Sequence, residues 1–141
     1  MNKTLSFILP ALNEESCIGT AIDEINQICS DNSIEVEIIV VDSDSKDKTV
    51  EIATSKKNTT VVNQPERGYG NALRAGFKVS KSDIIGFADP DSTYNFEEIP
   101  ELISWFDKGY GLINTDRLSA RQIKSFRLSN FIGNILISFF S

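Results

Sequence analysis

Histidine is absent from this 141-residue sequence, so the chain contains no histidine general base and no histidine metal ligand. Cysteine is scarce: Cys17 and Cys29 fall in one predicted helix, whose rise would separate them by about 18 Å. That distance is too long for a disulfide bond. We therefore expect two reduced thiols, as is usual in a cytoplasmic protein.

Long apolar runs are also missing. No stretch reaches the roughly 18 apolar residues of a membrane-spanning helix. Met1 to Pro10 shows no secretory signal pattern and passes directly into a strand pattern. The net charge is −6, which disfavours nucleic acid as a partner. The sequence is therefore that of a globular protein without a nucleic-acid-binding surface.

Short apolar strand patterns alternate with helical patterns along the chain. The strand patterns are Thr4–Leu9, ended by Pro10, then Val36–Val41, Thr59–Asn63, Asp83–Ala88 and Gly109–Asn114. The helical patterns are Glu14–Cys29 with Asn13 as N-cap, Asp47–Lys57 with Asp47 as N-cap, Gly70–Val79, Asn95–Phe106, and Arg121 onward. This alternation predicts an α/β fold with a mostly parallel sheet and helices on both faces.

Two carboxylates follow the predicted strand that ends at Ala88. Asp89 and Asp91 flank Pro90, and in parallel sheets ligands bind beyond the carboxyl ends of the strands. Carboxylates at such a strand end can bind a hard divalent cation, which completes its shell with substrate phosphates. A simple turn is the alternative, because aspartate and proline are common in turns.

Two further strand-end segments carry polar groups. Asp42 follows an apolar strand directly, where a carboxylate can accept hydrogen bonds from a nucleotide base or ribose, whereas Asp44 fits a polar turn equally well. The segment Arg67–Phe77 has two glycines before a helix, which favours phosphate binding at the helix N-terminus. It matches neither a P-loop nor the dinucleotide fingerprint, so a structural loop remains an alternative.

The C-terminal segment is basic and then apolar. Residues 117–127 contain four cations and no acid, and residues 128–140 are rich in Phe, Ile and Leu. A partner must cover such an apolar helix, and the domain itself, a second chain or a lipid interface would each do so. Dimerisation is therefore left open.

Taken in order, these segments resemble family-2 glycosyltransferases of the nucleotide-diphospho-sugar transferase fold (GT-A), above all the dolichyl- and polyprenyl-phosphate glycosyltransferases. The matching stretches are "ILPALNEE", "VVDSDSKDKT", "RGYGNALRAGF", "GFADPDSTYNFEEIP", "INTDR" and "NFIGNILISFF". Two positions depart from the family's usual residues: Pro90 replaces alanine within the D-x-D pair, and Tyr69 replaces lysine in the glycine loop.

The resemblance implies a role for each matching residue. The residues implied for nucleotide-sugar binding are Pro10, Ala11, Asn13, Glu14, Asp42, Asp44, Arg67, Gly68, Gly70 and Asp89. Asp89 and Asp91 are implied to bind Mg²⁺ or Mn²⁺ on the donor diphosphate, and with Arg117 they form the implied catalytic set. Arg117, Arg121 and Arg127 are implied to face the acceptor phosphate.

The implied reaction is an inverting, metal-dependent transfer of a hexose from a UDP- or GDP-sugar to a polyprenyl phosphate, as in cell-envelope glycan biosynthesis. Residues 1–116 would bind the nucleotide sugar, and residues 117–141 would begin the acceptor and membrane-interface region. Family members continue beyond this point, so we expect a truncated or split form. Alternatives are an inactive nucleotide-sugar-binding module and a transferase to a soluble saccharide. The implied location is cytoplasmic, peripheral at the membrane.

Overall fold

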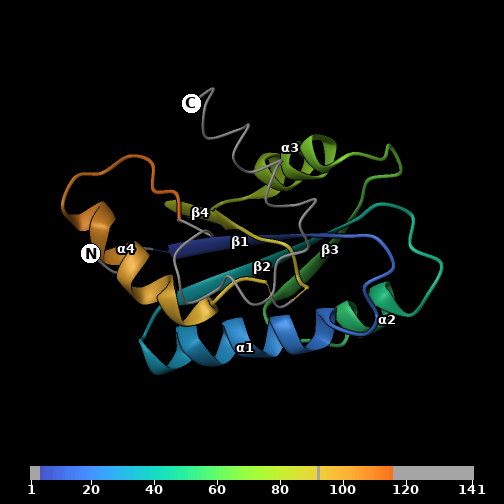
Figure 1. The fold of residues 1–141 in the computed structure, drawn as a ribbon, viewed down its shortest axis with the longest axis horizontal. Coiled ribbons are helices and arrows are strands. Elements are labelled where there is room, and N and C mark those ends of the chain that lie inside the picture. Colours follow the sequence, from blue (N-terminus) through green and yellow to red (C-terminus); the bar gives the residue numbers. More distant parts are fainter. Residues whose placement is uncertain (1–3, 92, 116–141) are drawn as a thin grey trace, which may run out of the picture. The chain divides into compact units, whose positions relative to one another are not determined.

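The computed structural model describes residues 4–91 and 93–115, whose helices and strands lie in one compact unit ending at Gly111 (Figure 1). Four parallel strands form one sheet in the order β3-β2-β1-β4. Their bounds are β1 Thr4–Ala11, β2 Glu35–Asp42, β3 Thr59–Asn63 and β4 Ile84–Phe87. Ala11 pairs with Asp42, and Asp42 pairs with Asn63, so three strands end at one level.

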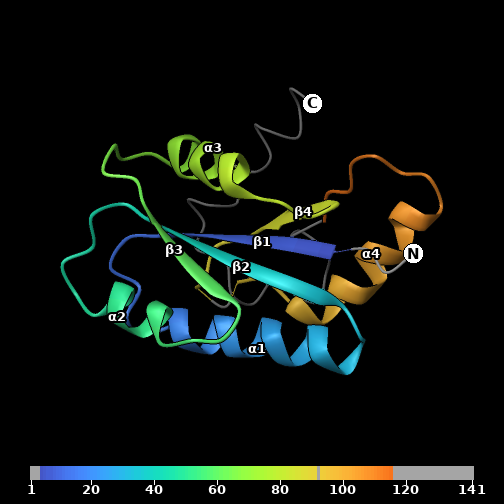
Figure 2. The same ribbon diagram turned by 180° about the vertical axis from the view of Figure 1, so that it is seen from behind.

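Helices cover both faces of this sheet. The helices are α1 Ile18–Asp31, α2 Thr49–Thr54, α3 Tyr69–Val79 and α4 Ile99–Asp107, with a 3-10 turn, η1 Phe96–Glu98, before α4. Helices α1, α2 and α4 lie on one face and α3 lies on the other, as the two opposite views show (Figures 1 and 2). The predicted α/β fold with a parallel sheet and helices on both faces is confirmed within the described residues.

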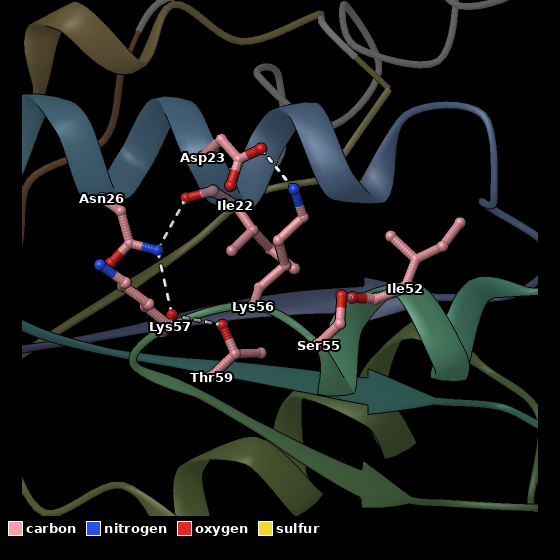
Figure 3. A network of polar contacts seen from close by, with 8 residues as sticks. All are labelled: Ile22, Asp23, Asn26, Ile52, Ser55, Lys56, Lys57 and Thr59. Carbon is pink, nitrogen blue, oxygen red and sulfur yellow. Dashed lines mark hydrogen bonds and ion pairs between the residues drawn. The ribbon is translucent and has the colours of Figure 1, made fainter.

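Successive side chains of β1 point to opposite faces of the sheet, so β1 contributes to an apolar core on each face. Leu5, Phe7 and Leu9 pack in the larger cluster with the buried face of α1. Ile8 points the other way and packs with Ile39, Val41 and Ala72 under α3. Helix α1 is further tied to the connection between α2 and β3, where Asn26 Nδ2 donates to the carbonyl of Lys57 at 3.1 Å (Figure 3). Helices on both faces thus hold the sheet between two apolar layers.

The prediction that Pro10 ends the first strand was wrong, because β1 continues to Ala11. Neighbouring residues of a strand direct their backbone groups to opposite sides. The carbonyl of Ala11 accepts from Ser43 on the β2 side, and that of Ile8 accepts from Ala88 on the β4 side. The nitrogen of Pro10 therefore points to the β4 side, beyond the point where β4 pairs with Ile8. The missing N–H removes no ladder hydrogen bond.

The predicted N-cap at Asn13 was also wrong. Helix α1 begins at Ile18, and Asn13 has φ of 57°, in the left-handed region that asparagine tolerates. The residues between them form a turn in which Cys17 and Ile18 donate to the carbonyl of Glu14. The predicted N-cap at Asp47 was wrong by one residue, because α2 begins at Thr49 with Lys48 as its N-cap. Asp47 Oδ1 still accepts from Thr49 N at 3.0 Å, just before the helix.

The predicted fifth strand over Gly109–Asn114 is not formed in residues 109–115. Gly109, at φ of 92°, donates to Phe106, and Tyr110 donates to Trp105. These two bonds cap the carboxyl end of α4 in a Schellman motif. The rings of Tyr110 and Trp105 lie 5.5 Å apart in an edge contact that completes the motif. The start of this segment therefore ends a helix instead of pairing in the sheet.

No helix in the described ranges is long and apolar enough to cross a membrane.

Helix α3 approaches β1 through Gly76. A Cβ added there would lie 2.7 Å from Ile8 Cγ2 and 2.9 Å from Ile8 Cδ1, and Ile8 is fully buried. We expect Gly76→Ala to lower the free energy of unfolding by about 1–3 kcal/mol in urea titration, because the core must shift to admit the methyl group. Gly70→Ala is the matched control, since its Cβ meets nothing within 4 Å. Equal losses for both variants would contradict the predicted clash.

Candidate functional site

A pocket of about 210 Å³ opens at the carboxyl ends of β1, β2 and β4. Its walls come from the end of β1 and the loops after all four strands, and from the start of α3. The lining residues are Pro10, Ala11, Leu12, Glu14, Ser43, Arg67, Gly68, Tyr69, Ala72 and Asp89. The site therefore lies where a parallel sheet is expected to bind its ligand.

Six of the residues expected to bind the nucleotide sugar line this pocket: Pro10, Ala11, Glu14, Arg67, Gly68 and Asp89. Five other expected residues do not line the pocket: Asn13, Asp44 and Asp91 in the same loops, Asp42 at the end of β2 and Gly70 in α3. Arg117, Arg121 and Arg127 lie outside the described residues, as does the predicted acceptor region 117–141. The pocket thus joins the glycine loop to the ends of β1 and β4.

Four lining residues were not selected from the sequence: Leu12, Ser43, Tyr69 and Ala72. Leu12, Ser43 and Tyr69 each lie between two residues that were selected, and Ala72 lies two residues after Gly70. Tyr69 stands between the two glycines, and Ser43 follows Asp42. Their position in the motif was a usable signal, whereas their side-chain chemistry was not.

Asp42 is buried, with 5% of its surface exposed, at the last position of β2. Its Oδ2 accepts from the backbone N–H of Ser45 at 3.1 Å. Its Oδ1 is buried and has no hydrogen-bond partner among the described residues. A buried carboxylate oxygen without a donor is costly, so a water molecule or a ligand would have to supply an N–H or O–H group there.

Asp44 has a different environment. It is exposed, has φ of 68°, and its Oδ1 lies 2.7 Å from Lys46 Nζ. The hydrogen bond and charge of Lys46, with a contribution from the charge of Arg67, hold the pKa of Asp44 below its usual range. Its charge is therefore already compensated within the loop, which favours the turn interpretation over direct ligand binding.

The D-x-D pair presents two carboxylates near the pocket. Asp89 lines the pocket, Pro90 is buried, and Asp91 is exposed. Asp91 Oδ1 accepts from Thr93 N at 3.2 Å and from Thr93 Oγ1 at 2.7 Å, which fixes the turn. Within the ranges described, no three acidic or thiol side chains are grouped to hold a metal ion. Carboxylate oxygens are the ligand type that a hard divalent cation prefers, and such a cation takes further ligands from phosphate and water.

A protonated thiol lies beside this acidic edge. Cys17 Sγ donates to Glu14 Oε2 at 3.1 Å. Burial, and then the hydrogen bond and charge of Glu14, raise the pKa of Cys17 to about 11, and the charge of Asp91 adds to the effect. The loop after β1 and the D-x-D loop are therefore electrostatically coupled. The thiol is a hydrogen-bond donor at neutral pH and a poor nucleophile.

The family model described as glycosyl transferase family 2 matches residues 6–130. The chain belongs to glycosyltransferase family 2. This assignment confirms the family resemblance found from the sequence motifs. It also agrees with the fold, in which the motifs lie at the carboxyl ends of neighbouring strands.

Two archaeal relatives from Haloferax volcanii match this family-2 chain. It is 39% identical over 107 residues to the low-salt glycan biosynthesis hexosyltransferase Agl6, a match that covers 75% of this chain and 25% of the relative. It is 31% identical over 131 residues to a dolichyl-phosphate hexose transferase, covering 93% of this chain and 55% of the relative. The chain thus spans a quarter to about half of these relatives.

A solved structure of glucosyl-3-phosphoglycerate synthase from Mycobacterium tuberculosis is similar in fold. The TM-score is 0.61 at 34% identity, over 74% of this chain and 39% of that one. That crystal structure is a complex with Mn²⁺, uridine diphosphate and glucosyl-3-phosphoglycerate. The GT-A fold expected from the sequence is therefore confirmed for the described part of the family-2 chain.

Proposed function

We propose that this chain binds a nucleotide-diphosphate sugar in the pocket, for an inverting transfer of the hexose to a polyprenyl phosphate with Mg²⁺ or Mn²⁺. The observation that carries the proposal is that no described residue donates to the buried Oδ1 of Asp42, whose neighbour Ser43 lines a pocket together with Arg67 and Asp89. The dolichyl-phosphate hexose transferase relative supports the lipid acceptor, and the similar synthase structure supports Mn²⁺ and a uridine nucleotide.

The nucleoside would lie at the β1 and β2 end of the pocket. A base N–H or a ribose hydroxyl would donate to Asp42 Oδ1 and satisfy an oxygen that is otherwise buried without a donor. Pro10 and Ala11 offer an apolar floor for the base. Asp42 thereby selects a ligand with a donor at this point, because an acceptor there would face a carboxylate.

The diphosphate would lie between the glycine loop and the D-x-D pair. Arg67 lines the pocket and supplies a planar cation suited to phosphate, while Gly68, at φ of 128°, lets the backbone pass close to the ligand. Asp89 and Asp91 would hold the divalent cation. When bound, that cation neutralises the negative charge that develops on the leaving diphosphate.

The transfer itself needs no base from the described residues. An oxygen of the acceptor phosphate is already anionic at neutral pH, and it forms a bond to the anomeric carbon. The bond from that carbon to the diphosphate breaks, and the nucleoside diphosphate leaves with the electron pair. Attack from the opposite face inverts the configuration. Arg117, with Arg121 and Arg127, is assigned to orient the acceptor phosphate.

In the proposed function the chain has two parts, which meet at residue 116. Residues 1–116 are assigned to the nucleotide sugar, and residues 117–141 to the acceptor side. Because a polyprenyl phosphate resides in a membrane, we place the action at the cytoplasmic membrane face, with the protein bound peripherally. The relatives that act on lipid phosphates support this placement.

Calorimetric titration of the 141-residue chain tests the proposal. We expect UDP-glucose or GDP-mannose to bind, and to bind more tightly with Mn²⁺ than with EDTA. ATP, a triphosphate with no sugar on its terminal phosphate and a different base, serves as the control ligand. Absence of binding by both nucleotide sugars at millimolar concentration, with or without Mn²⁺, would overturn the proposal.

A further inference from the structure

Side chains from the loop after β2 hold the loop after β1. Asn13 N donates to Ser45 Oγ at 2.9 Å, and Lys46 N donates back to Asn13 Oδ1 at 2.8 Å. These reciprocal bonds explain how Asn13 is kept at its positive φ. They also assign Asn13, expected from the sequence to touch the nucleotide, to the contact between the two loops.

A second set of hydrogen bonds between the same two segments involves the buried side chain of Thr49. The backbone N–H of Glu14 donates to Thr49 Oγ1 at 2.8 Å. Thr49 is fully buried, and its hydroxyl donates to Asp47 Oδ1. A hydroxyl has one hydrogen, so its bond to Asp47 leaves the oxygen lone pairs for Glu14. The other oxygen of Asp47, Oδ2, accepts from Glu15 N at 3.1 Å.

A side chain of the loop after β1 also accepts a hydrogen bond from the backbone of the segment after β2. Glu15 Oε2 accepts from Lys48 N at 3.0 Å, which closes a ring of contacts between the two loops. Residues between a strand and a helix have no ladder partner for their N–H groups, so these side chains supply the missing acceptors. The backbone of Glu14 is thereby fixed at both ends, since its carbonyl accepts from Cys17 and Ile18.

We infer that Thr49 and Asp47 are positioning residues for the donor site, which set the Glu14 side chain against the pocket by holding the backbone of Glu14 and Glu15. Glu14 lines the pocket, whereas Thr49 and Asp47 do not, so they act through it. The same loop also holds Asp42, through Ser45 N. The inference rests on the proposed function, because the ligand so served is the nucleotide sugar.

Thr49→Val and Thr49→Ser separate positioning from simple structural support. Valine keeps the shape but removes the hydroxyl, so we expect the Kd for the nucleotide sugar to rise about tenfold in the folded protein. Serine keeps the hydroxyl and loses the buried methyl group, so its stability falls but its Kd stays within about twofold of the parent value. Thr54→Val is the matched control, since among the described residues the Thr54 hydroxyl bonds the carbonyl of Val50 in its own helix.

A second readout needs no nucleotide. The thiol of Cys17 bonds the Glu14 carboxylate, so a displaced Glu14 frees the thiol. We expect Ellman's reagent to modify Cys17 several-fold faster in Thr49→Val than in the parent, Thr49→Ser or Thr54→Val proteins. Equal thiol rates in Thr49→Val and the parent protein would overturn the inference. A parent protein that binds no nucleotide sugar but shows the thiol difference would contradict the proposed function and leave the positioning role supported.

Discussion

Asp91→Asn is expected to abolish the gain in nucleotide-sugar affinity that Mn²⁺ provides. The two D-x-D carboxylates are the proposed metal ligands, and the described residues contain no group of three metal-ligating side chains. Removing one charge therefore removes half of the protein's contribution to the cation. Loss of groups that merely support a metal ligand already costs about 10–100-fold, so we expect a loss of at least about 100-fold for the ligand itself.

The substitution isolates metal binding because an asparagine Oδ1 can still accept the two bonds from Thr93 that fix the turn. Paired titrations with Mn²⁺ and with EDTA measure the gain directly. Glu97→Gln is the matched control, since Glu97 is an exposed acid in the following turn, η1. If the gain from Mn²⁺ survived in Asp91→Asn, the cation would have to bind elsewhere.

The fold was largely predictable because its strands are apolar runs that end at polar residues. The runs that became β1, β2, β3 and β4 are short and rich in Ile and Val, and each strand end could be located from a proline or an acid nearby. Strand ends in a parallel sheet share one edge, so the loops that carry the motifs were expected to meet. The pocket among these loops agrees with that expectation.

The local conformations that could not be predicted depend on hydrogen-bond partners from other segments of the chain. Asn13 suits both a helix N-cap and a left-handed turn, and the choice is made by Ser45 and Lys46 from another loop. The segment from Gly109 has the composition of a strand, yet its first two residues are used to cap α4. A local pattern records propensity and periodicity, but it does not record which group satisfies each backbone N–H.

The candidate site shows the same contrast between what the local sequence predicts and what distant partners decide. Asp42 was selected because it ends an apolar strand, and the structure adds that one of its oxygens is buried without a donor. Asp44, two residues later, was selected with it, but its charge is compensated by Lys46. The residue pattern already separated the two in part, since Asp42 follows an apolar strand directly whereas Asp44 fits a polar turn equally well. It did not show their burial or the partner of each oxygen, which depend on the fold.

Asp42→Asn is expected to weaken nucleotide-sugar binding by about 10- to 100-fold, since a hydrogen bond to a charged group contributes about 1.5–3 kcal/mol. The asparagine oxygen can still accept from Ser45 N, but its amide hydrogens would then face the ligand's donor at the former Oδ1 position. Two hydrogen-bond donors would then face each other, so the complex loses a hydrogen bond and gains a repulsion between the two N–H or O–H groups.

The same substitution should not destabilise the free protein. In the parent chain the Oδ1 of Asp42 is a buried, charged oxygen without a donor, and a neutral amide costs less to bury than a carboxylate. We therefore expect the free energy of unfolding in urea at pH 7 to stay equal or rise, while calorimetry shows the loss of affinity. Glu24→Gln, an exposed acid on α1, controls for the change of charge. A variant that lost stability but kept its affinity would show that the buried oxygen serves the fold and not the nucleotide.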